Sequence, residues 1–243
     1  MMKHLQSLVY NRDIDISNGL RLKVPTVGEI IDIGEDTYYH SAFILTATPY
    51  DLMVQLHDAG IDFSNVSDYD VFLCTFPAQQ KDDVSIFLDD IIPGDFVVRG
   101  SVDKKENELY NPHSGVVIDR VTYTIMSDNI RSMNFFEKHQ NKPGNKEAYD
   151  YMIQKARKQQ KRAARREKHL ELERQIIAMV NSPEFKYDFQ SVRGITIYAF
   201  NASVRQILHR LDYSNVMRGV YAGTVDFSKI NKSSIDWLNC EIK

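Results

Sequence analysis

The apolar positions of this chain follow mainly helical spacing, and the longest uninterrupted stretch runs from Lys146 to about Val180. It contains no glycine or proline, and its middle is built from Lys, Arg, Gln, Ala and Glu, which are good helix formers. Apolar residues occur only at its ends, around Met152 and from Leu170 onwards. The pattern predicts one continuous helix, roughly 50 Å long at ~1.5 Å per residue. Asn145 is its expected N-cap, and its middle is expected to be a solvated bridge between two packed bodies.

Ahead of this stretch, the pattern predicts short helices and a small amount of β structure. Asn18-Gly19 is a strong hairpin signal, and Thr26-x-x-Glu29 fits a capping box. Thr48 followed by Pro49 marks another helix start. The expected elements are a hairpin at 10–24, helices at 26–34, 36–46, 48–59, 67–76, 82–92 and 119–136, and a β-meander at about 95–118.

After the long stretch, Asn181-Ser182-Pro183 is expected to end the helix, because proline lacks the backbone donor. A helix from near Asp188 and a second helix at 213–221 should follow, with Trp237 as an anchor in the last turn. The predicted class is α+β, mainly α, with a small antiparallel β element. The predicted division is a mixed helical and β domain at 1–138, a linker at 139–146, the long basic helix at 147–180, and a helical unit at 181–243.

Charge is distributed unevenly along the chain. The segment from Lys155 to Lys168 holds eight basic residues and one acid, so it carries about +7 while the whole chain carries −3. The rest therefore carries about −10. The basic run is open to three interpretations: a solvated helix face, a surface for an acidic partner or the acidic remainder of the chain, and a nucleic-acid contact. The candidate interaction face consists of Arg157, Lys158, Lys161, Arg162, Arg165 and Arg166. The basic middle has no apolar heptads, which disfavours a coiled coil between copies.

Composition narrows the class of protein. With 43% apolar residues and 26 aromatics, the chain can form a sizeable core. No segment approaches the ~20 apolar residues of a membrane span, and the start lacks the apolar region of a secretory signal. The two cysteines, Cys74 and Cys240, are far apart, and Cys74 is expected to be a buried small hydrophobe. These features favour a reducing cytoplasm. The mild acidity argues against a dedicated nucleic-acid binder.

No catalytic, cofactor or metal constellation is evident in the sequence. It has no phosphate-binding loop, dinucleotide fingerprint, nucleophile elbow or zinc-protease motif. The seven histidines are scattered without metal-ligand spacing. The pairs Asp82-Asp83 and Asp89-Asp90 are better explained as helix N-terminal acids and a polar helix face than as an acid–base or metal site. The residues therefore predict a non-enzymatic interaction protein without cofactor.

Three blocks of sequence resemble tail-morphogenesis proteins of phages and prophages of Gram-positive bacteria. They are KVPTVGEIIDIGEDTYY at 23–39, TPYDLMVQLHDAGIDFSNVSDYDVF at 48–72, and the C-terminal stretch 195–238 that begins ITIYAFNASVRQIL. Together they look like the tail assembly chaperone type across most of the chain.

The resemblance implies a factor in the host cytoplasm that binds the helical tape measure protein, or tail tube subunits, without catalysis. A tape measure protein is a long amphipathic helix, and a groove lined by aromatic and Met side chains would accept its apolar stripe. The alternatives are a structural tail or baseplate protein of the virion and, less favoured, a nucleic-acid-binding accessory protein that uses the basic helix.

Overall fold

The computed structural model describes residues 5–17, 19–101, 106–138, 141–163, 171–230 and 236 of the 243-residue chain. Of the described residues 57% are helical, counting the 3-10 turns, and the predicted α+β, mainly α class is confirmed. In the described residues the helices are α1 (Leu5–Val9), α2 (Val27–Ile33), α3 (Glu35–Thr46), α4 (Met53–Asp58), α5 (Asp68–Thr75), α6 (Arg120–Asn134), α7 (Lys146–Ala163), α8 (Glu171–Val180) and α9 (Ile197–Tyr221). The strands are β1 (Ile14–Ser17), β2 (Leu20–Leu22), β3 (Val97–Gly100), β4 (Asn107–Tyr110) and β5 (Val117–Ile118). Short 3-10 turns are η1 (Phe63–Asn65), η2 (Phe76–Ala78), η3 (Pro93–Asp95), η4 (Ser191–Gly194) and η5 (Phe227–Lys229).

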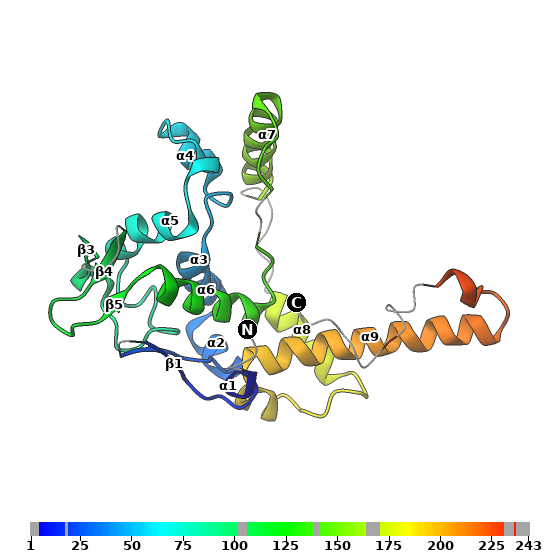
Figure 1. The fold of residues 1–243 in the computed structure, drawn as a ribbon. Coiled ribbons are helices and arrows are strands. Elements are labelled where there is room, and N and C mark those ends of the chain that lie inside the picture. Colours follow the sequence, from blue (N-terminus) through cyan, green and yellow to red (C-terminus); the bar gives the residue numbers. More distant parts are fainter. Residues whose placement is uncertain are drawn as a thin grey trace.

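The two small sheets lie at the edge of the helical body (Figure 1). The predicted hairpin forms from antiparallel β1 and β2, with Ile14 opposite Leu22 and both side chains buried. Gly19 adopts a φ of 80°, which favours glycine, while Asn18 lies outside the described residues. The second sheet has the order β3-β4-β5, and Leu109 of β4 is buried opposite Ile118 of β5. Each sheet thus buries one face against the helices.

The centre of the body is the packing of α3 against α5 and α6. Tyr38 of α3 is fully buried, and its hydroxyl donates a 2.8 Å hydrogen bond to Asn134 at the end of α6. Phe87 packs beside the Tyr38 ring. Phe87 belongs to 82–92, where the helix prediction was wrong, since this segment is a series of turns. Backbone hydrogen bonds between residues three apart, such as Phe87 N to Val84 O at 3.0 Å, form these turns. Most apolar side chains of the segment point into the core.

Local capping chemistry behaves largely as the sequence predicts. Thr26 and Glu29 form both bonds of the capping box at α2, with Glu29 N to Thr26 Oγ1 at 3.2 Å and Thr26 N to Glu29 Oε2 at 2.8 Å. The Thr48 hydroxyl and the Asp51 carboxylate are also bonded, at 2.7 Å. The residues that follow form turns, however, and α4 begins only at Met53. A capping pair therefore does not by itself determine the residue at which the regular helix begins.

The C-terminal segment is built into the body through the start of α2. Val27 N donates to Ile195 O, and Ile197 N donates to Pro25 O, both at 2.9 Å. α9 then packs against α6 and α1. The first turn of α9 is buried, with Phe200 at 0% exposure. These contacts join segments that are far apart in sequence.

The prediction of one continuous helix from Lys146 to Val180 was wrong in the described residues. The stretch contains α7 and α8, which pack against different elements and point in different directions (Figure 1). Leu172 N at the start of α8 donates to the carboxylate of Glu35, at 3.1 Å to each oxygen. This backbone donor therefore bonds to a side chain from another element. Asn145 caps α7 as predicted, accepting from Ala148 N at 2.8 Å.

Two further expectations require correction. The C-terminal helices predicted around 195–211 and 213–221 are one helix, α9, because no glycine or proline interrupts the chain before Gly219. Thr196 caps it, accepting from Ala199 N at 3.0 Å. Cys74 is exposed, because its position on α5 faces away from the buried neighbours Phe72 and Leu73. Cys240 and Trp237 lie outside the described residues.

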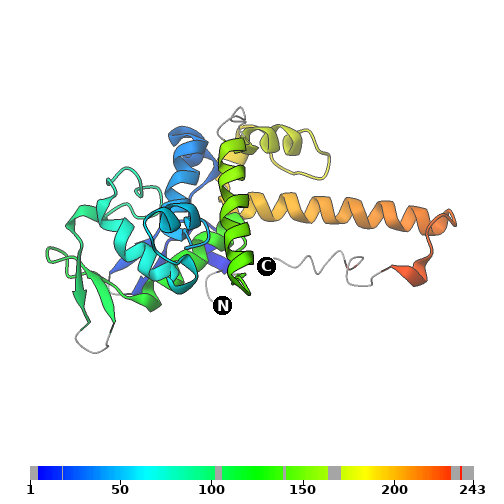
Figure 2. The ribbon, with the colours of Figure 1, turned by 90° about the horizontal axis from the view of Figure 1, so that it is seen from above.

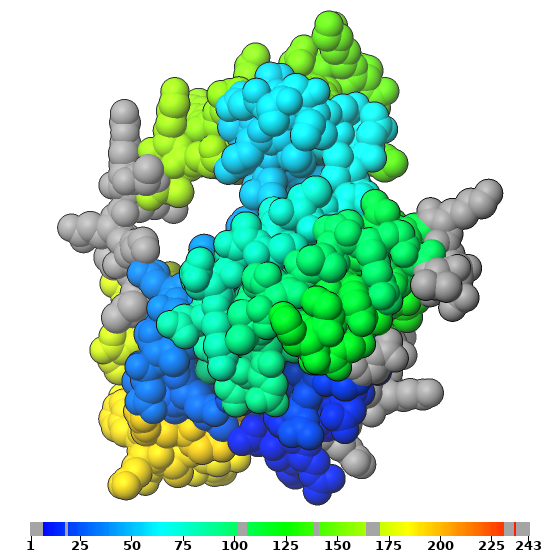
Figure 3. Space-filling model, turned by 90° about the vertical axis from the view of Figure 1, so that its left-hand side faces the viewer, coloured from blue at the N-terminus to red at the C-terminus, as the bar shows by residue number. Residues whose placement is uncertain are grey.

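Two parts of the molecule stand out from the body. α4 and α7 pack on each other and form a lobe above it (Figures 1 and 3). α9 projects to the side over most of its 25 residues (Figure 2). Within the described residues, no helix is both long enough and apolar enough to span a bilayer.

Candidate protein-binding site

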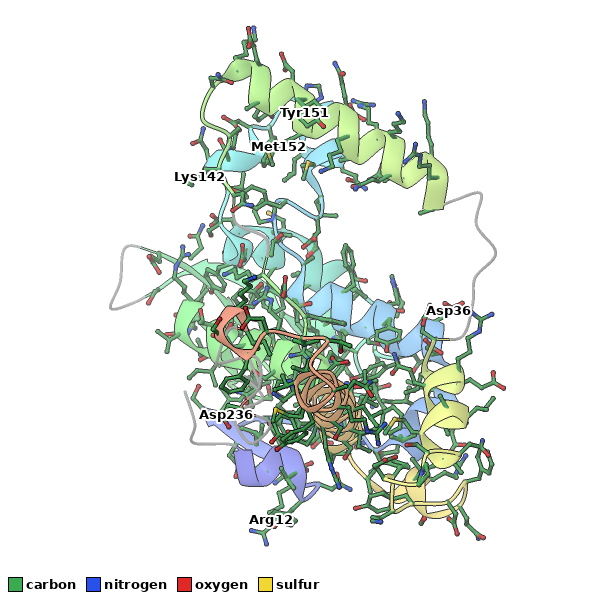
Figure 4. The ribbon with its side chains drawn as sticks, turned by 90° about the vertical axis from the view of Figure 1, so that its right-hand side faces the viewer. Arg12, Asp36, Lys142, Tyr151, Met152 and Asp236 are labelled. Atoms are coloured by element: carbon green, nitrogen blue, oxygen red, sulfur yellow. The ribbon has the colours of Figure 1, made fainter. Side chains whose placement is uncertain are left out.

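An apolar groove lies where α8 meets α2. The Glu35 carboxylate at the start of α3 accepts the Leu172 amide and so holds the N-terminus of α8 beside α2. Asp36, the next residue, lies beside the start of α8 (Figure 4). A carboxylate at a helix N-terminus is also favoured by the helix dipole. The groove wall formed by α8 is therefore positioned by one charged hydrogen bond as well as by packing.

The floor and walls of this groove differ in exposure. Its volume is about 570 Å³. The floor side chains are buried, whereas the wall residues Ile31, Ile177 and Phe189 are 44%, 47% and 56% exposed. The buried floor residues are Ile30, Leu172, Ile176 and Val192. Large apolar side chains gathered around a concavity are typical of a site for an apolar partner segment.

The rim of the groove is mainly acidic. Glu35 and Glu173 line it, and the exposed Glu171 is the first residue of α8. Arg193 also lines the groove, and it pairs with Asp32 at 2.7 Å, so its charge is already balanced. The groove therefore presents an apolar centre with a net negative edge.

The predicted basic face lies on the α4–α7 lobe, away from this groove. Arg157 forms an ion pair with Asp58 of α4, and this cation lowers the pKa of the Asp58 carboxyl. Lys158, Lys161 and Arg162 are exposed, and in the described part of the chain they form no ion pair. Arg165 and Arg166 lie outside the described residues. The structure thus brings Arg157 to an acid and leaves its three described neighbours in solvent.

The lobe is held together by the opposite side of α7. The ring of Tyr149 stacks on Phe63 of η1 with centroids 4.8 Å apart. Ile153, one turn further along, is the buried residue of α7. The Arg157–Asp58 pair extends this contact by one more turn. Of the apolar residues that the pattern predicted to pack at this end of the helix, Ile153 is buried, whereas Tyr151 is 65% exposed.

A second cavity, of about 540 Å³, lies between α5 and α6 and is polar. Buried Arg131 donates to Thr46 O at 2.5 Å, which caps the end of α3. Asp68 lies 3.8 Å from Arg131 and 2.5 Å from Lys138. Burial raises the pKa of Tyr123 to about 12, although the Arg131 cation lowers it. This network joins α3, α5 and α6 through charged and polar contacts.

Metal-ligating side chains are not gathered in the described residues. In that part of the chain, no three His, Cys, Asp or Glu side chains are placed to hold a metal ion. His57 and His209 lie on different elements. The His57 ring is hydrogen-bonded to the Asp58 carboxylate, and the His209 ring to the backbone oxygen of Asp236.

Sequence reasoning missed the groove, although the sequence contains a signal for it. Ile30-Ile31 and Ile176-Ile177 are adjacent isoleucines within helices. Successive helix residues point about 100° apart, so both members of such a pair cannot face the same core. In each pair one isoleucine is buried and the other is exposed at the groove wall.

Comparison with known proteins finds one family model that matches this chain, and the match covers the α8 side of the groove. The profile of a family described as "YomV second domain" matches residues 158–241, about a third of the chain. This family is phage-derived. No curated protein and no solved structure matches the chain. The matched region includes α8, Phe189 and η4, whereas the α2 wall of the groove lies outside it.

Proposed function

We propose that this protein is a non-enzymatic phage tail assembly factor, with a chaperone-like role in the host cytoplasm. Its client would be the tape measure protein or the tail tube protein, bound through an amphipathic helix. The observation that carries the proposal is the groove between α2 and α8, with exposed Ile31, Ile177 and Phe189 around a buried apolar floor. The phage character of the matched family and the resemblance of three sequence blocks support it.

The size of the groove suits a short helical segment. A volume of about 570 Å³ accommodates two or three large apolar side chains. Full burial of one such side chain contributes roughly 1.5–3 kcal/mol. Two anchors at i and i+4 would give a weak, reversible complex once the free-energy cost of association is subtracted. Reversible binding is what an assembly factor requires, because its client must leave to join the tail.

Co-expression with the tape measure protein of the same phage tests this function. The wild-type chain should increase the soluble yield of the tape measure protein and elute with it from a sizing column. A groove variant, Ile31→Asp with Ile177→Asp, should lose both effects because charges then face the apolar client.

A matched control separates groove loss from misfolding. Val121 of α6 is 58% exposed and lines neither of the two cavities described above, so Val121→Asp places a charge of the same kind on an apolar surface position elsewhere. It should keep full activity. Equal client recovery with the groove variant and the control, at equal melting temperature, would refute the proposal.

A structural role in the tail is the second candidate, and the projecting part of α9 favours it. Leu208, Leu211 and Tyr221 on this helix are exposed, as expected for a surface that other subunits cover in an assembly. Mass spectrometry of purified virions separates the two functions. A chaperone is absent from mature particles, whereas a structural component is present at fixed stoichiometry.

A further inference from the structure

The outward side of α7 presents one aromatic and three basic side chains in a single line. Tyr151, Lys155, Lys158 and Arg162 are spaced by four, three and four residues, which places them on one helix face. We call this set the α7 stripe. Tyr151 is 65% exposed, and the three basic residues are exposed as well. Figure 4 shows Tyr151 on the N-terminal half of α7.

Nothing in the described structure opposes the charge of the stripe. The sequence from Tyr151 to Ala163 contains no acid, and among the described residues the one ion pair of α7 is that of Arg157, which lies on another face. Lys158 and Arg162 are four residues apart and repel each other. The helix dipole compensates in part, since cations are favoured near a helix C-terminus. An exposed tyrosine in line with unopposed cations matches a partner surface that is apolar in its centre and acidic around it.

The groove between α2 and α8 is such a surface on the same chain. Its walls are Ile31, Ile177 and Phe189. Its edge carries Glu35 and Glu173, next to Glu171, which is also exposed. Within one copy, α7 is held on α4 by the Tyr149–Phe63 stack and the Arg157–Asp58 pair. The α7 stripe that fits the groove would therefore come from another copy of the chain.

We propose that the α7 stripe of one copy docks into the α2–α8 groove of a second copy, with Tyr151 in the apolar centre and the lysines against Glu171 and Glu173. The proposal shares only the location of the groove with the proposed function. The projection of the α4–α7 lobe above the body allows the exchange to be reciprocal (Figure 1). Two copies related by a two-fold axis then make the same contact twice.

Reciprocity matters because a single contact is small. Specific interfaces bury about 1,200–2,000 Å² in total. One helix face in a groove covers only part of that area, and two identical contacts double it. The partner is a protein rather than nucleic acid, because the chain outside the basic run carries about −10 and repels a polyanion.

Light scattering coupled to a sizing column tests the proposal. At 50 mM salt the wild-type chain should show a mass close to twice its 28.1 kDa. In 500 mM salt the dimer should dissociate at least tenfold more readily, because salt screens the exposed charge pairs. Lys155→Glu with Lys158→Glu should be monomeric under both conditions. A control with the same charge change at exposed positions on other elements, Arg12→Glu with Lys81→Glu, should remain dimeric.

A charge swap gives the decisive measurement. Adding Glu171→Lys and Glu173→Lys to the stripe variant restores opposite charges across the interface, so this quadruple variant should dimerise again. A wild-type chain that is monomeric at 50 mM salt overturns the proposal, as does a stripe variant that stays dimeric. A monomeric wild-type chain that binds duplex DNA with a steep salt dependence overturns it in favour of a nucleic-acid contact.

The same variants distinguish this inference from the proposed function. The stripe variant keeps an intact groove, so it should still solubilise the tape measure protein. If it does so and is monomeric, both ideas stand. If no form of the protein binds a client but the stripe variant is monomeric and the charge swap dimerises, the proposed function fails and the self-association stands.

Discussion

The carboxylate of Glu35 gives the sharpest test of how the groove is built. It accepts the Leu172 amide at 3.1 Å and provides the acceptor for one of the free donors at the start of α8. Glu35→Ala removes this hydrogen bond to a charged group, worth about 1.5–3 kcal/mol when buried. Because the site is partly exposed, we expect a loss of about 1–2 kcal/mol, close to that of an ordinary N-cap deletion.

The loss should be local as well as global. For a chain of this size, about 1–2 kcal/mol corresponds to a decrease in melting temperature of about 2–8 °C. Hydrogen exchange should report the local effect, with the amides of α8 exchanging about tenfold faster for each 1.4 kcal/mol of lost protection. Glu35→Gln keeps an acceptor without the charge and should lie between the wild type and the alanine variant.

Glu173 provides the control for this experiment. It lies in the first turn of α8 and lines the groove, but in the described structure it accepts no hydrogen bond from the helix. Glu173→Ala should therefore change only the interaction with the helix dipole, about 0.3–1 kcal/mol. If Glu35→Ala does not accelerate exchange in α8 beyond Glu173→Ala, the carboxylate does not position the helix and the reasoning is refuted.

Three other measurements test further contacts. Gly28→Ala should lower the free energy of unfolding by about 1–2 kcal/mol, measured by urea titration, because a Cβ atom would lie 2.8 Å from Arg193 O and overpack the junction. Tyr123→Phe should be neutral or slightly stabilising at pH 7, because the buried hydroxyl has no hydrogen-bond partner in the described structure. Burial raises the pKa of Tyr123 to about 12, so above pH ~10 the phenol ionises in the unfolded chain before it ionises in the folded one, and stability falls as pH rises towards 12; the variant lacks this loss and should show a shallower alkaline transition. The lowered pKa of Asp58 predicts the opposite window: the Arg157 contact persists above pH ~4 and is lost as pH falls further, and Asp58→Asn should remove this acid dependence of exchange in α7.

Sequence reasoning succeeded where the physical cause is local. Thr26 and Glu29 are three residues apart and cap the helix through their own side chains, whatever the rest of the chain does. The same holds for Asn145 at α7. The Asn18-Gly19 signal correctly predicted a hairpin, because its turn depends on the backbone freedom of Gly19.

Sequence reasoning failed where a distant contact outweighed local preference. The stretch from Lys146 to Val180 has no internal breaker, yet its described parts, α7 and α8, point in different directions, and the Leu172 amide of α8 donates to Glu35, 137 residues away. Segment 82–92 has helical apolar spacing but forms turns, and its Phe87 packs on the ring of Tyr38 in α3, a contact that the local sequence does not encode.

The basic face illustrates the same division. The sequence determined that its cations are unopposed by acids near them in the chain, and the exposure of Lys158 and Arg162 agrees with this. Only the tertiary structure decided that Arg157 is an exception, since its partner Asp58 lies on α4.

For this protein, then, composition, caps and apolar spacing determined the mainly helical class and most helix starts, because these depend on side chains within one or two turns. Only the tertiary structure determined which apolar side chains remain exposed and where they lie. Ile31 and Ile177 lie 146 residues apart in sequence, and each stays exposed while the isoleucine before it is buried. They form a groove only because α8 docks beside α2, and no pattern along the chain encodes the meeting of two distant helix faces.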